Sequence, residues 1–138
     1  MNRSSPDPSP PTKSYGLASN HSWLAKFRNS FRGVLRGFTN AGQPMGRNSF
    51  LVHVPVAMAV LFAGWWRELD LAWMVVLIGC IALVWTAELF NTSIECLSRS
   101  ITDQPNANIR DALDIASGGV LVASGFAALL GVIALVFG

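Results

Sequence analysis

Residues 71–95 read LAWMVVLIGCIALVWTAELFNTSIE. The first part, residues 71–87, contains no charged side chain, and an apolar run of that length predicts a membrane-spanning helix. Glu88 and Glu95 then follow on the same stretch. A carboxylate inside such a helix is costly unless it faces protein, water or a cation, so it marks a candidate functional site.

Two further apolar segments flank this stretch in a chain of 138 residues, of which 51% are apolar and 13% are charged. Residues 50–66 form the shorter segment, and residues 115–137 form a longer one without charge. Charge this sparse is unusual in a soluble protein of this size. We therefore predict an all-α integral membrane protein with three transmembrane helices, at about 49–66, 71–97 and 112–137.

The segment before the first span has a different pattern. Within residues 22–38, an apolar stripe recurs at spacings of three and four, formed by Trp23, Phe27, Phe31, Leu35 and Phe38. Basic residues occupy other positions, which predicts an N-terminal amphipathic helix on the membrane surface. Residues 1–20 are rich in Pro and Ser and predict a disordered tail, so the membrane domain is residues 21–138. Residues 40–46 predict a turn into the first span.

The basic residues predict the orientation in the membrane. Most precede the first span or lie between the second and third, namely Lys13, Lys26, Arg28, Arg32, Arg36, Arg47, Arg99 and Arg110. Only Arg67 lies in the turn between the first and second spans. By the positive-inside rule, the N-terminus and the 98–112 loop are cytoplasmic. Glu95 then lies near the cytoplasmic interface, with Glu88 about two turns deeper.

A group of polar residues lies at this end of the second and third spans. Glu88, Asn91 and Glu95 share one helix face, because residues three, four and seven apart lie on the same side. An antiparallel third helix would bring Asp114 to a similar depth, and three converging carboxylates repel each other unless a cation lies among them. Mg²⁺ carried with a nucleotide would fit. For Asp111 we favour an electrostatic role in the first helical turn, and for Asn91 an interhelical hydrogen bond is the alternative.

The run AELFNTSIE, residues 87–95, resembles the signature of the prokaryotic diacylglycerol kinase / undecaprenol kinase family, Ala-Glu-x-x-Asn-Thr/Ser-Ala-Ile-Glu. The resemblance extends over residues 22–137. It includes Ser30-Phe31-Arg32-Gly33 before the first span, Phe50 and His53 at the start of that span, and Ala112, Asp114 and residues 116–121 in the third.

The resemblance implies a lipid kinase. Such proteins are homotrimers of three-span subunits in the bacterial inner membrane, and they phosphorylate a membrane lipid alcohol, diacylglycerol or undecaprenol, with MgATP. Their composite sites lie between subunits at the cytoplasmic face, and no nucleic-acid partner is expected. The roles that the resemblance implies are a general base for Glu88, a Mg²⁺ ligand for Glu95, cofactor binding for Asn91 and Asp114, and contact with the lipid substrate for Ser30 and Ser117.

Two positions depart from the family pattern. The family has a lysine directly before its third-helix aspartate, where this chain has Leu113, and a metal-binding glutamate before the first span, where it has Arg47. These departures support an alternative, a catalytically impaired relative that acts as a membrane scaffold or lipid-binding protein. A proton- or ion-conducting bundle would also explain membrane carboxylates, but the outer halves of the spans are purely apolar.

Overall fold

A computed structural model describes residues 23–39, 50–101 and 104–138 of the chain, and every regular element in these ranges is a helix. The helices are α1 (Trp23–Thr39), α2 (Phe50–Trp66), α3 (Leu71–Ile101) and α4 (Ala107–Phe137). The predicted tail, the predicted turn at 40–46 and Arg47 lie outside the described residues. The all-α prediction is therefore confirmed for the described part of the chain.

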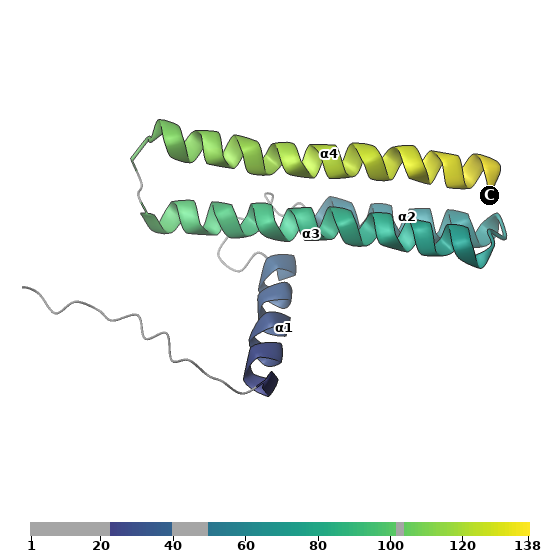
Figure 1. Cartoon of the computed structure of the whole chain (residues 1–138), viewed down its shortest axis with the longest axis horizontal. Coiled ribbons are helices and arrows are strands. Elements are labelled where there is room, and N and C mark those ends of the chain that lie inside the picture. The colour runs from purple at the N-terminus through teal and green to yellow at the C-terminus, as the bar shows by residue number, and fades with distance from the viewer. Residues whose placement is uncertain (1–22, 40–49, 102–103) are drawn as a thin grey trace, which may run out of the picture.

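The two long helices, α3 and α4, run side by side, and α2 folds back along them (Figure 1). α1 crosses the bundle steeply, with its C-terminal end against α3 (Figure 1). Phe38 of α1 makes this contact, because its ring lies 4.3 Å from that of Phe50 and 5.1 Å from that of Trp85, measured between centroids. Gly37 approaches so closely that an added Cβ would collide with the side chain of Leu89. α1 is thus packed against α3 through its last turn.

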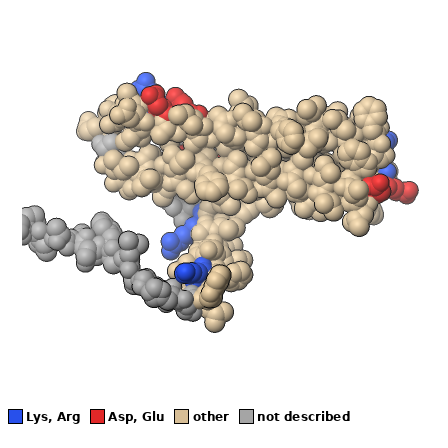
Figure 2. Space-filling model, viewed as in Figure 1, with Lys and Arg blue, Asp and Glu red and all other residues tan. Residues whose placement is uncertain are grey.

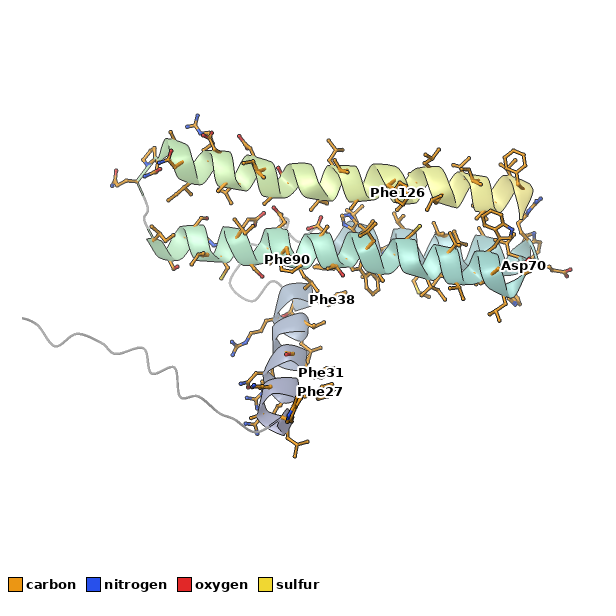
Figure 3. All side chains as sticks on the ribbon, viewed as in Figure 1. Phe27, Phe31, Phe38, Asp70, Phe90 and Phe126 are labelled. Atoms are coloured by element: carbon orange, nitrogen blue, oxygen red, sulfur yellow. The ribbon has the colours of Figure 1, made fainter. Side chains whose placement is uncertain are left out.

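A tight turn joins the C-terminal end of α2 to the N-terminal end of α3. The backbone N–H of Leu69 donates to the carbonyl of Gly64 at 3.1 Å, and Glu68 takes a left-handed φ of 54°. Asp70 caps α3, because its Oδ1 accepts from the backbone N–H of Trp73 at 3.0 Å. Figure 3 labels Asp70 at this end. Leu69 then packs in a small apolar core with Leu77 and Ala134.

α4 begins earlier than the sequence predicted. Asn106 caps the helix, and its Oδ1 accepts from the backbone N–H groups of Asn108 at 3.0 Å and Ile109 at 3.3 Å. The helix therefore starts at Ala107, and its first turn contains no acidic residue. The predicted first-turn role of Asp111 is wrong, because Asp111 lies a full turn inside the helix.

The apolar surface of the long helices is largely exposed. α3 and α4 are long and apolar enough to cross a membrane. Within the most apolar 18-residue stretch of each helix, only 22% (α3) and 11% (α4) is buried inside the protein. α2 is apolar but shorter, so the three-span topology stays a prediction. On the face shown in Figure 2, charged side chains lie at the ends of the bundle and on α1, with an uncharged band between. This distribution is typical of a protein whose middle contacts lipid tails.

α1 has the bounds expected for the surface helix to within one residue at each end. Apart from Phe38, its large apolar side chains are exposed, including Trp23, Phe27 and Phe31, and Figure 3 shows the labelled phenylalanines along one side of the helix. Its location on a membrane surface stays a prediction.

Candidate functional site

Glu88 is the most deeply buried carboxylate among the described residues, with only 4% of its surface exposed. It lies on α3, three turns before the polar C-terminal end of that helix, and faces α2. There its Oε1 lies 3.7 Å from Nε2 of His53. The contact joins two different helices, so the helix packing determines how the carboxylate is held.

The second oxygen of Glu88 has a different environment. Oε2 is buried and has no hydrogen-bond partner among the described residues. A buried carboxylate oxygen without a partner costs free energy, so such a group in a native protein calls for an explanation. An oxygen that takes a proton from a bound substrate must be left available in this way.

Asn91 and Glu95 form a second polar unit one turn further along α3. Asn91 is buried, and its Nδ2 donates to Oε1 of Glu95 at 3.0 Å. Oε2 of Glu95 lies 3.8 Å from the guanidinium of Arg99, in an ion pair that is partly exposed. The amide therefore orients the Glu95 carboxylate and leaves it reachable from solvent, which suits a ligand for a hydrated cation.

Asp114 and Ser117 lie on α4, and both are exposed. The Ser117 hydroxyl donates to the backbone carbonyl of Asp114 at 3.0 Å. Asp114 lines a polar pocket of about 340 Å³ between the ends of α3 and α4, together with Arg99, Arg110 and Leu113. The two guanidinium groups outnumber the one carboxylate, so the pocket has a net positive charge, which suits a phosphate-bearing ligand.

The predicted sharing of one cation by Glu88, Glu95 and Asp114 is not found. The described parts of the chain contain no group of three or more His, Cys, Asp or Glu residues that could hold a metal ion. Glu88 faces α2, whereas Glu95 contacts Arg99 on its own helix. Asp114 lines the polar pocket between the ends of α3 and α4. Ser30 is exposed on α1, on a different element from the other candidates.

An apolar cavity of about 410 Å³ lies between α2, α3 and α4, and His53 is one of the residues that line it. Its described lining is largely aliphatic, including Val56, Val60, Ile81 and Ala128, and contains no Asp or Glu. The imidazole thus marks the boundary between this apolar space and the carboxylate.

Sequence reasoning gave His53 no role in the site, and it considered Arg99 only as a replacement for the missing family lysine, not as a partner of Glu95. His53 is a lone imidazole in an apolar segment, and that signal could have identified it as a partner for a membrane carboxylate. Arg99 follows Glu95 by four residues, the spacing of a helical ion pair, so its contact was visible in the sequence.

Comparisons with known proteins bear on this geometry. A family model described as prokaryotic diacylglycerol kinase matches residues 29–135. An undecaprenol kinase of Bacillus subtilis (strain 168) is 30% identical over 112 residues, which cover 77% of this chain and 90% of that protein. No solved structure matches the chain significantly. The matched range includes every candidate site residue described above.

Proposed function

The chain belongs to the prokaryotic diacylglycerol kinase family and is a membrane lipid kinase, and we propose that Glu88 is the general base of its reaction. The reaction would transfer the γ-phosphoryl group of ATP to the hydroxyl of a membrane lipid alcohol at the cytoplasmic face. The observation that carries the proposal is the buried Glu88 carboxylate with Oε2 unpartnered among the described residues.

Glu88 would act through that oxygen. As the lipid hydroxyl oxygen attacks the γ-phosphorus, its proton passes to Oε2 of Glu88, and ADP leaves from the opposite side. Phosphoryl transfer requires mainly positioning and charge neutralisation from the protein, so a small set of polar residues suffices. Burial keeps water from competing for the carboxylate.

Glu95 would hold Mg²⁺. Mg²⁺ commonly binds through one or two protein carboxylates and the substrate phosphates, so Glu95 with ATP fits this donor set. When bound, the ion neutralises charge on the β- and γ-phosphates. Asn91 would hold Oε1 of Glu95 in place, in line with the 3.0 Å hydrogen bond between them.

The exposed candidates fit a site that is completed between subunits. Asp114 would bind the nucleotide from the polar pocket, where Arg99 and Arg110 stand in for the family lysine that Leu113 replaces. Ser117 and Ser30 would contact the lipid, and their exposure on α4 and α1 leaves them open to a neighbouring subunit of a homotrimer. We propose that this assembly lies in the bacterial inner membrane, with α1 on the cytoplasmic side.

The acceptor is either undecaprenol or diacylglycerol. The similar Bacillus protein is named as an undecaprenol kinase, which makes undecaprenol the first acceptor to test.

The test is transfer of radiolabelled γ-phosphate from ATP to each lipid by the full chain in detergent micelles with Mg²⁺. We expect a labelled lipid product with the natural chain and a loss of about 100-fold or more with Glu88→Gln. Ser93→Ala is the matched control, because its hydroxyl is exposed and bonds only its own helix backbone, at Leu89. Undiminished transfer by Glu88→Gln would remove Glu88 as the base, and transfer to neither lipid would overturn both acceptors.

A further inference from the structure

His53 faces the proposed base from the neighbouring helix. We propose that His53 is a positioning residue, whose Nε2 holds Oε1 of Glu88 across the α2–α3 contact and leaves Oε2 as the oxygen that takes the proton. This inference rests on the proposed function, because it assigns a role to a residue that acts through Glu88.

The two groups are close neighbours at a separation longer than a direct hydrogen bond, and the contact would shorten as the substrate complex forms. Nε2 of His53 and Oε1 of Glu88 are 3.7 Å apart, and the exposed fractions of the two side chains are 25% and 5%. The two oxygens of Glu88 therefore differ in their surroundings, since Oε1 faces the His53 nitrogen and Oε2 has no hydrogen-bond partner among the described residues. A carboxylate held at one oxygen has a fixed orientation, which general-base catalysis needs because reacting atoms must be aligned.

Neighbouring aromatic rings hold α2 in place. Phe50 precedes His53 by three residues and shares its helix face, and Trp85 stands in the same relation to Glu88 on α3. Phe50 is buried, and its ring centroid lies 6.5 Å from that of Trp85. The two faces therefore meet in a packed contact, and His53 reaches Glu88 from a fixed backbone.

Among the described residues, Glu88 is the carboxylate that contacts His53. The imidazole borders the apolar cavity between α2, α3 and α4, whose described lining has no Asp or Glu. Polar contacts between transmembrane helices can also be purely structural, and such a contact would affect the amount of folded protein. A positioning role instead affects the turnover of the folded enzyme.

The experiment compares His53→Leu, which removes the nitrogen, with His53→Gln, whose amide can still reach Oε1. Turnover is measured per folded enzyme with the lipid acceptor and MgATP in micelles. We expect His53→Leu to lower kcat by about 100-fold with both KM values unchanged, and His53→Gln to keep most of the activity. Met58→Leu is the matched control on α2, because Met58 is exposed and does not line the cavity.

Two further variants keep the test decisive. His53→Asn preserves polarity but is too short to reach Oε1, so it should behave as His53→Leu even if the leucine variant folds poorly. In the Glu88→Gln background, His53→Leu should cause no additional loss, because residues that act as a unit are not additive.

Three outcomes would overturn the role of His53. The first is a normal kcat in His53→Leu or His53→Asn, and the second is an equal loss in His53→Gln and His53→Asn. The third is a further loss when His53→Leu is added to Glu88→Gln. Full activity of Glu88→Gln alone would instead overturn the proposed base. The two failures are therefore distinguishable.

Discussion

The two ends of the bundle are built differently. Apolar side chains fill the space between helices at the end with the 67–70 turn. Toward the other end, a carboxylate is buried. We name these the turn end and the site end, the latter comprising Glu88, Asn91, Glu95 and Asp114. At the turn end Leu77 is 1% exposed and packs with Leu69 and Ala134. At the site end Glu88 is almost as buried, yet one of its oxygens has no described partner.

The difference shows where the chain favours stability and where it favours function. A Cβ added to Gly64 at the turn end would lie 3.0 Å from side-chain atoms of both Leu77 and Met74, so this packing is close. The site end keeps polar groups that cost free energy to bury and that packing alone does not require. The predictions below test whether the two ends separate stability from activity.

Of the next three variants, Glu95→Gln at the site end should have the largest effect. The substitution keeps an acceptor for the Asn91 amide but removes the charge that would hold Mg²⁺. We expect activity to fall by about 100-fold at limiting Mg²⁺ and to recover partly at high Mg²⁺. Cys96→Ala is the control, because Cys96 is the exposed neighbour. Wild-type activity of Glu95→Gln at every Mg²⁺ concentration would contradict the metal role.

At the turn end, Leu77→Ala should change stability and leave the chemistry intact. It removes a fully buried side chain from the apolar core, so the free energy of unfolding in detergent should fall by about 2 kcal/mol. The kcat of the protein that remains folded should match the natural value. A loss of kcat per folded molecule would mean that the two ends are coupled, which breaks the comparison.

The smallest effect concerns two glycines of α1. A Cβ at Gly33 would meet nothing within 4 Å, whereas a Cβ at Gly37 would collide with Leu89 of α3. Gly33→Ala should therefore raise the free energy of unfolding by up to about 1 kcal/mol through helix propensity, and Gly37→Ala should gain less because Leu89 must move. Thermal unfolding of both variants measures the difference. Equal gains would show that α1 does not pack on α3 through Gly37.

The sequence predicted most of the helix positions because hydrophobic periodicity and length decide them. α2 (Phe50–Trp66) lies within the first span predicted at about 49–66, and the surface-helix segment differs by one residue at each end. α3 continues through polar residues to Ile101, four residues beyond the predicted second span, whose limits in the membrane stay a prediction. There Ser98 and Ser100 bond backbone carbonyls of their own helix, so polarity does not end it.

The site was only partly predictable for a physical reason. The spacing of Glu88, Asn91 and Glu95 within one helix was readable, and the Asn91–Glu95 hydrogen bond follows from it. The contact of Glu88 with His53 depends on how α2 packs against α3, which no local pattern encodes. The distance between Asp114 and Glu88 was not predictable from local patterns either, because it depends on the depth and the rotation of both α3 and α4.

The most direct test of the account measures stability and activity together for Glu88→Gln. We expect phosphate transfer to fall by about 100-fold or more while the free energy of unfolding stays equal or rises, because a neutral amide costs less to bury than a carboxylate. A fall in unfolding free energy like that of Leu77→Ala, with activity lost only in proportion to the folded protein, would contradict it. Glu88 would then be part of the packing rather than of the chemistry.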